Sequence, residues 1–333
     1  MKRIKTIDAV GEELVHDLTR IVKDVHKGRE FKRGHIVQEE DIQRLLSMGK
    51  THLYVKDNEN DEDLIFEEDA AVRLKDLCIN EHMYAGEISE GKIEIFSDID
   101  GLFTVDIERL NKINELKNIM IATRWGGVPV KKNAKLAGMR VIPLFIKKDE
   151  LDALIPFETG EPLLKVHPLQ DKKVGIVITG SEVYHGRIED KFKDVLESKC
   201  NDYSLEIVDV QYSDDDMDMI LKKISVVREK GANIILCTGG MSVDPDDLTP
   251  GAIKESGAEI ITYGSPVLPG AMFLLGYFKD GTTIMGLPGS VMYEKQTVFD
   301  LIFPYTIADI TLTKRDIAKL GYGGLLMNPS REN

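Results

Sequence analysis

The chain has few cysteines and no long apolar run. Its three cysteines, Cys78, Cys200 and Cys237, are an odd set, and their spacing suits neither a disulfide framework nor a metal site. No stretch approaches the roughly 18 consecutive apolar residues that a membrane-spanning helix needs. We therefore expect reduced, mostly buried thiols in a cytoplasmic protein with no membrane partner.

Positive charges are also fewer than negative ones. With 43 Lys and Arg against 57 Asp and Glu, the formal net charge is −14. This balance argues against nucleic acid as a partner, because nucleic-acid binding depends on clustered basic residues. The P-loop, GxGxxG and nucleophile-elbow motifs are absent, so ordinary nucleotide kinases, Rossmann dehydrogenases and serine hydrolases lose support.

The most informative stretch that is present is CTGGMSVDPDDLTP, from Cys237 to Pro250. It follows the apolar run 232–237, which predicts a buried parallel strand, and Thr249 with Pro250 predicts a helix with a threonine N-cap. Glycines and a helix start let backbone N–H groups approach a phosphate. Because the loop has three aspartates and no lysine, we expect a bridging divalent cation. For this turn alone, the alternative is that the aspartates are solvated caps.

Two more loops repeat the pattern of strand, polar turn and helix. They are Thr179–Glu182 and Gly286–Ser290, and each follows a short apolar run. Residues 205–210 predict a fourth strand, which ends before the polar run 213–216, and residues 291–302 predict a helix. The carboxyl ends of parallel strands share one edge of a sheet. We therefore expect an α/β domain with a doubly wound, mainly parallel sheet, on whose edge these loops converge.

Residues 171–312 resemble the molybdopterin-binding domain of molybdenum cofactor biosynthesis proteins. The Thr-Gly-Gly loop that closes on Asp247-x-Thr249-Pro250 is similar to the pterin-phosphate loop of molybdopterin adenylyltransferases. The Thr-Gly-Ser-Glu turn at 179–182 is closer to the Thr-Gly-Asp-Glu turn of molybdenum insertases, and Gly286-Leu-Pro-Gly289 matches both branches. Residues 10–21 and 136–146 also resemble the insertase branch.

The resemblance implies a protein that binds a phosphorylated pterin or a nucleotide together with Mg²⁺. It is compatible with molybdopterin adenylyltransferase or molybdenumtransferase activity and leaves open whether any chemistry is performed. In this interpretation Asp247 and Asp214 hold the Mg²⁺ and act in catalysis. The residues expected to bind molybdopterin are Thr179, Gly180, Ser181, Glu182, Thr238, Gly239, Gly240, Ser242, Thr249, Pro288, Gly289 and Ser290.

The chain departs from the insertase pattern in three places. Ser290 follows Gly289 where insertases continue with Asn-Pro, Leu268 replaces a basic residue before a Pro-Gly turn, and residues 1–150 have no Asp-Gly-Tyr-Ala motif. Two alternatives therefore stay open. One is a non-catalytic carrier or sensor of the pterin, and the other is a nucleotide pyrophosphohydrolase similar to competence-damage-inducible proteins.

Prolines, glycines and polar stretches divide the chain into three predicted regions. Residues 1–170 are expected to form an α+β region with many short strands and a linker over 151–170. Residues 171–312 are the expected α/β domain, and residues 313–333 a C-terminal tail. The resemblance also implies a homodimer, in which the N-terminal region of one chain approaches the pterin cleft of the other.

Overall fold

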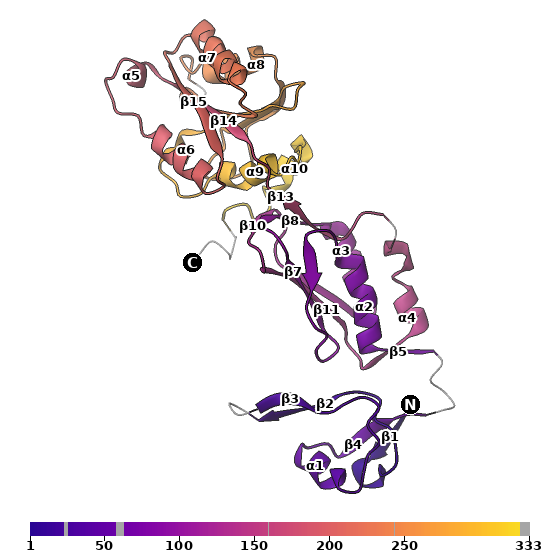
Figure 1. The fold of residues 1–333 in the computed structure, drawn as a ribbon. Coiled ribbons are helices and arrows are strands. Elements are labelled where there is room, and N and C mark those ends of the chain that lie inside the picture. Colours follow the sequence, from indigo (N-terminus) through magenta and orange to yellow (C-terminus); the bar gives the residue numbers. More distant parts are fainter. Residues whose placement is uncertain (23–25, 58–62, 159, 243, 327–333) are drawn as a thin grey trace. The chain divides into compact units, whose positions relative to one another are not determined.

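The structure, a computed structural model, describes residues 1–22, 26–57, 63–158, 160–242 and 244–326 (Figure 1). Val243 of the predicted site loop and residues 327–333 of the predicted tail lie outside this set. The chain divides into two compact units. Unit 1 comprises Met1–Ile99, Thr104–Gly126 and Lys132–Val166; unit 2 comprises Asp100–Phe103, Gly127–Lys131 and His167–Asn333.

Unit 1 consists of short strands and short helices, as the sequence predicts for the N-terminal region. Its strands are β1 (Lys2–Lys5), β2 (Leu18–Val22), β3 (His26–Phe31), β4 (His52–Val55), β5 (Leu64–Phe66), β6 (Met83–Ala85), β7 (Ile93–Ser97), β9 (Ile119–Thr123), β11 (Lys135–Val141) and β12 (Phe145–Lys147). Its helices are η1 (Thr6–Asp8), α1 (Asp41–Ser47), α2 (Glu67–Cys78), α3 (Ile107–Asn114), α4 (Lys148–Asp152) and η2 (Ile155–Phe157).

An antiparallel sheet in the order β6-β7-β11-β9 carries helix α2 on one face. Along β7 buried residues alternate with partly exposed ones, which is the pattern of a sheet with one covered face. Leu74 and Leu77 of α2 are buried, because they lie on the helix face that meets the sheet. The apolar face of α2 thus closes this part of the core.

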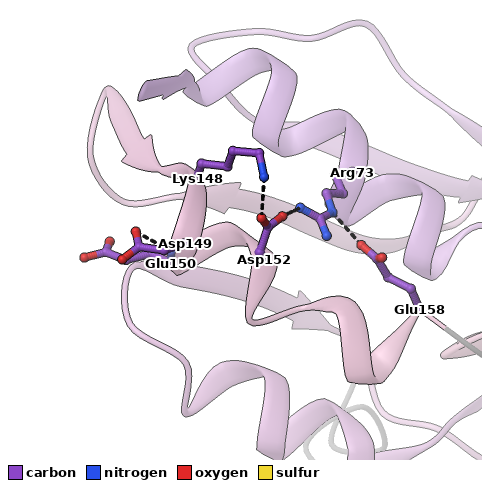
Figure 2. A network of polar contacts seen from close by, with 6 residues as sticks. All are labelled: Arg73, Lys148, Asp149, Glu150, Asp152 and Glu158. Carbon is purple, nitrogen blue, oxygen red and sulfur yellow. Dashed lines mark hydrogen bonds and ion pairs between the residues drawn. The ribbon is translucent and has the colours of Figure 1, made fainter. Parts of the chain in front are cut away.

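The residues expected to form a linker carry regular structure. The segment 151–170 holds the end of α4, helix η2 and strand β13 (Leu164–Pro168). Its first part is tied to α2 by Arg73, whose Nη1 donates to Asp152 Oδ1 at 2.8 Å and whose Nε donates to Glu158 Oε1 at 2.5 Å (Figure 2). These ion pairs connect the first part of the stretch to α2.

Unit 2 contains the predicted strands and the helices between them. Its strands are β14 (Lys173–Thr179), β15 (Glu206–Ser213), β16 (Ile234–Thr238), β17 (Glu259–Tyr263), β18 (Leu274–Tyr277) and β19 (Thr283–Leu287). Its helices are α5 (Ser181–Tyr184), α6 (Phe192–Asn201), α7 (Met217–Glu229), α8 (Thr249–Glu255), η3 (Gly289–Met292), α9 (Val298–Ile307) and α10 (Lys314–Lys319). Strand β10 (Val128–Val130) also belongs to this unit and pairs with β8 (Gly101–Val105).

The six-stranded sheet has the order β15-β14-β16-β19-β18-β17. The first four strands are parallel, and β18 and β17 run antiparallel to their neighbours. One buried cluster holds Leu196 of α6 and Phe303 of α9, and a second holds Ile224 of α7 and Ile253 of α8. Because the helices form two separate clusters with the sheet strands, the prediction of a doubly wound, mainly parallel sheet is confirmed.

Two expectations at the end of unit 2 need correction. The helix predicted over 291–302 begins only at Val298, because Thr297 and Asp300 form a capping box at that point. The predicted tail contains helix α10, and its Ile317 is buried in the core. Within the described ranges, no helix has both the length and the apolar character needed to cross a lipid bilayer.

Candidate functional site

The carboxyl ends of the four parallel strands lie on one edge of the sheet. Thr179 is level with Ser213, and Thr238 is level with Leu287. The loops that follow these strands therefore leave the sheet side by side, as the sequence predicts. They contain residues 179–190, 213–216, 238–249 and 286–290.

Three threonines meet where β14 and β16 end. The hydroxyl of Thr179 donates to the carbonyl oxygen of Thr238 at 3.3 Å and lies 2.8 Å from the hydroxyl of Thr249. All three residues are buried, with at most 3% of their surface exposed. Thr249 is the first residue of α8 and its side chain makes no cap, so the predicted N-cap is wrong. The hydroxyl is instead engaged by Thr179.

Two glycines let the chain pass close to these hydroxyls. Gly239 has a φ of +90°, and a Cβ atom there would lie 2.0 Å from the carbonyl oxygen of Thr179. Gly240 has a φ of +51°, and its Cβ would lie 3.2 Å from Thr249 Oγ1. Only glycine suits the first position, since both its backbone angle and the space exclude a side chain.

Several polar atoms on this edge are buried and have no hydrogen-bond partner among the described residues. They are Thr238 Oγ1, Asp247 Oδ2 and Ser290 Oγ. A buried polar atom left without a partner costs about 1–3 kcal/mol, so folded proteins rarely keep several together. An arrangement of this kind is typical of a surface that completes its hydrogen bonds with a ligand.

Tyr263, which sequence reasoning missed, holds the acidic loop. Its hydroxyl reaches the carbonyl oxygens of Met241 and Ser242, each at 3.1 Å. Burial, and then the charge of Asp247, raise the pKa of Tyr263, so the phenol stays a protonated donor. No motif marks this residue, because it comes from the antiparallel edge strand β17.

Asp214 and Asp215 make hydrogen bonds within their own edge of the site. Asp214 Oδ1 accepts from the amide of Asp215 at 2.9 Å, and Asp214 Oδ2 lies 3.0 Å from His185 Nε2. The amide hydrogen bond first, and then His185, lower the pKa of Asp214. Asp215 Oδ2 accepts from the amide of Ser181 at 2.8 Å. Both carboxylate oxygens of Asp214 thus already have hydrogen-bond partners within the chain.

The structure brings no third ligand to the predicted Mg²⁺ pair. Across the described part of the chain, no three or more His, Cys, Asp or Glu side chains form a group that could hold a metal ion. A Mg²⁺ ion on Asp247 and Asp214 therefore stays a prediction. Asp247, with one buried unpartnered oxygen, is the better fitted of the two.

The remaining predicted residues come from the segments that follow the same parallel strands. Pro288 is buried, Gly180 and Ser181 are partly buried, and Glu182, Ser242 and Gly289 are exposed. Gly180 and Ser242 lie in loops, Ser181 and Glu182 in α5, Pro288 directly after β19, and Gly289 at the start of η3. Their contact with a ligand stays a prediction, as does that of the three threonines, of which only Thr238 has a hydroxyl without a partner among the described residues.

Comparison with known proteins identifies this part of the chain. Residues 175–308 match a family model described as "Probable molybdopterin binding domain". Unit 2 therefore contains a molybdopterin-binding domain of the molybdenum cofactor biosynthesis family. Residues 3–57 match a second model, described as a domain of unknown function (DUF8806).

A curated relative agrees with this assignment. The molybdopterin molybdenumtransferase of Staphylococcus aureus (strain MRSA252) is 26% identical over 133 residues, which are 38% of this chain and 31% of the relative. The chain thus matches about a third of the length of that protein.

Solved structures are less similar in sequence to this chain than the Staphylococcus aureus relative is. The tungsten cofactor synthesizing protein MoaB from Pyrococcus furiosus is 19% identical with a TM-score of 0.33, covering 37% of this chain and 86% of that one. The protein CinA from Thermoplasma acidophilum is 14% identical with a TM-score of 0.35, covering 41% of this chain and 98% of that one. The sequence matches, and not these structures, carry the assignment.

Proposed function

We propose that unit 2 binds a phosphorylated pterin of the molybdopterin type at the carboxyl edge of its parallel strands. The observation that supports this most is the set of buried polar atoms without partners. Of the five such atoms in unit 2 for which the structure shows no partner, three lie in the predicted ligand loops, on Thr238, Asp247 and Ser290. A ligand that supplies their hydrogen bonds would remove their cost.

The chemistry of these atoms suits a phosphate. The hydroxyls of Thr238 and Ser290 can donate to phosphate oxygens, and Gly239 and Gly240 keep side chains out of the way. Hydrogen bonds to an ionised oxygen are stronger than bonds between neutral groups, so two or three hydroxyls can hold one phosphate. The pterin would extend from this point across the exposed residues of the loops.

Asp247 would hold Mg²⁺ between its carboxylate and the phosphate. Oxygen ligands of this kind are the ones that Mg²⁺ prefers, and the ion would neutralise the charge of the bound phosphate. Asp214 fits this role less well, because His185 and the Asp215 amide already occupy its oxygens. Asp214 would instead position the loop after α5, through its contact with His185.

Covalent catalysis by a cysteine has no support in unit 2. Cys237 is completely buried in β16, and burial raises the pKa of its thiol above the usual range. Burial likewise raises the pKa of Cys200 to about 12. Any group transfer, such as the activity in the name of the Staphylococcus aureus relative, would rest on positioning and charge neutralisation. The transferase, carrier and pyrophosphohydrolase alternatives, like the homodimer, remain proposals.

A pair of threonine substitutions tests the binding proposal. Thr238→Val removes an unpartnered buried hydroxyl from the site, and Thr306→Val removes one from α9, outside the site. Both changes should keep or raise the melting temperature, because each removes an unsatisfied polar atom. Only Thr238→Val should weaken binding of the pterin phosphate, by roughly tenfold or more, in a fluorescence titration of the full chain.

The outcome is decisive in both directions. Equal affinity in the wild type and in Thr238→Val would show that no phosphate rests on this hydroxyl. A panel of molybdopterin, ATP and ADP-ribose, each with and without Mg²⁺, would then separate a pterin protein from a nucleotide enzyme by thermal shift.

A further inference from the structure

Tyr263 lies at the carboxyl edge of the parallel strands, although it comes from the antiparallel part of the sheet. It is the last residue of β17 and pairs with Leu274 of β18. Leu274 in turn pairs with Gly286, next to the last residue of β19. The backbone of Tyr263 is therefore level with the end of a parallel strand, and its side chain is within reach of the loops that leave this edge.

The side chain of Tyr263 joins both ends of the acidic loop, whose described residues are 239–242 and 244–248. Its hydroxyl lies 3.1 Å from the carbonyl oxygens of Met241 and Ser242, so it can donate to either of them. The Nζ atom of Lys254 lies 5.4 Å from the centre of the ring, which is within the range of a cation–π contact. Lys254 belongs to α8, the helix that begins directly after the loop. Tyr263 thus contacts the chain that enters the loop and the helix that follows it.

Asp247 lies between these two fixed points. Its amide donates to the carbonyl oxygen of Asp244 at 3.0 Å. A Cβ atom at Gly240 would lie 3.5 Å from Asp247 Oδ1, so the carboxylate turns back toward the start of the loop. Its other oxygen, Oδ2, is buried and has no partner among the described residues. The place of this carboxylate therefore depends on the path of the loop that Tyr263 holds.

We propose that Tyr263 is a positioning residue, which fixes the start of the acidic loop and thereby places the carboxylate of Asp247 for Mg²⁺. This inference rests on the proposed function, in which Asp247 holds the ion at the bound phosphate. A carboxylate that is held in place before the ligand arrives loses little conformational entropy when it binds. Residues that orient a ligating group from behind commonly change metal affinity tenfold or more. Tyr263 acts in this way through the loop and not through contact with the ligand.

The test is a double-mutant cycle with Tyr263→Phe and Asp247→Asn. It measures the affinity of the full chain for molybdopterin by fluorescence titration, with Mg²⁺ and again with the ion removed by a chelator. With Mg²⁺, Tyr263→Phe removes only the hydroxyl and should lower the affinity roughly tenfold. In the Asp247→Asn background, or without Mg²⁺, the same change should lower it less than about threefold, because the interaction that Tyr263 supports is already lost.

The matched control is Tyr277→Phe, which removes a tyrosine hydroxyl from the neighbouring strand β18. That hydroxyl accepts a hydrogen bond from the amide of Leu312 at 3.0 Å. Tyr277 pairs with Thr283 at the start of β19, so it lies at the opposite edge of the sheet from the site. Tyr277→Phe should lower the melting temperature, since it leaves an amide without its partner, and keep the affinity for molybdopterin. Tyr263→Phe should lower the affinity and leave the melting temperature nearly unchanged.

The outcomes distinguish this inference from the proposed function. If Tyr263→Phe keeps the wild-type affinity, or lowers it by the same factor with and without the Asp247 carboxylate, Tyr263 does not act through Asp247 and the inference fails. Binding of molybdopterin by the wild type would leave the proposed function intact in both cases. If Tyr277→Phe weakens binding as much as Tyr263→Phe does, the effect is one of general stability, and the inference fails again. A wild type that does not bind molybdopterin would overturn the proposed function together with this inference.

Discussion

Two clusters of polar side chains, one in each unit, differ in how completely they are satisfied. In unit 1, Asp152 accepts from Lys148 Nζ and from Arg73 Nη1, each at 2.8 Å, and Arg73 also holds Glu158 (Figure 2). In unit 2, Thr238 and Asp247 each bury an atom that has no partner among the described residues. The first cluster completes its bonds within the chain, and the second does not.

The difference supports a structural role for the first cluster and the proposed binding role for the second. The ion pairs of Asp152 connect α2 with the end of α4, so their effect is on the stability of unit 1. The unpartnered atoms of unit 2 lower stability unless a ligand is bound, and such a cost persists in proteins chiefly at functional sites. Burial and charge alone would not distinguish the two clusters. The number of polar atoms left without a hydrogen-bond partner does distinguish them.

The largest effect is expected from Gly239→Ala. The new Cβ would lie 2.0 Å from the carbonyl oxygen of Thr179, so β14 and the loop after β16 must separate. We expect ligand binding to be lost in a titration and the melting temperature of unit 2 to fall. The matched control is Gly257→Ala, where φ is +88° but no atom lies within 4 Å of the new Cβ. It bears the backbone cost of about 1 kcal/mol or more without the clash.

The control decides what Gly239 does. If both variants lose the same amount of stability and both bind ligand, then Gly239 serves only its backbone angle and not the close approach to Thr179. The comparison between the two clusters would then lose one of its main supports in unit 2.

The sequence predicts the frame of the site well. The parallel strands are runs of nearly continuous buried residues, which is why β14, β16 and the order of their loops could be derived from local pattern. The capping box of Thr297 and Asp300 is also local, and the Thr-x-x-Asp spacing could have placed the start of α9. Local sequence pattern therefore predicts the strands and helices, and the edge of the sheet at which their connecting loops lie.

Contacts between distant residues could not be predicted in this way. Tyr263 reaches the acidic loop from an edge strand, and Arg73 pairs with Asp152 from a helix far earlier in the chain. The hydroxyl of Thr249 was predicted to cap a helix, but in the folded chain it bonds to Thr179. In each case the partner is fixed by tertiary packing, which competes with the local preference and overrides it.

A smaller effect is expected when one carboxylate is changed in each cluster. Asp247→Asn should leave the melting temperature nearly unchanged and reduce the effect of Mg²⁺ on ligand affinity by about 10²-fold if Asp247 holds the ion. Asp152→Asn should lower the melting temperature of unit 1 and leave Mg²⁺ and ligand binding unaltered, because its partners are Lys148 and Arg73. Calorimetric melting and titration with and without Mg²⁺ measure both. Loss of Mg²⁺ dependence in Asp152→Asn, or unchanged dependence in Asp247→Asn, would contradict the comparison.

The smallest effect is a dependence of unit 1 stability on acid. The hydrogen bond from Lys148, and next the one from Arg73, lower the pKa of Asp152. A carboxyl whose pKa is lower in the folded state contributes stability that is fully present above its unfolded pKa, about 4. That contribution is lost as the pH falls through the folded pKa, because the protonated group no longer pairs with the cations.

The difference in melting temperature between the wild type and Asp152→Asn isolates this contribution. All other titrating groups are shared, so their effects cancel in the difference. We expect a constant difference from about pH 7 to about pH 5, and a progressive decline below that range. A difference that persists unchanged in acid would mean that Asp152 stabilises unit 1 by packing and not by charge. The structural cluster of unit 1 would then not depend on its ion pairs, and its contrast with the site in unit 2 would have to rest on the unpartnered atoms alone.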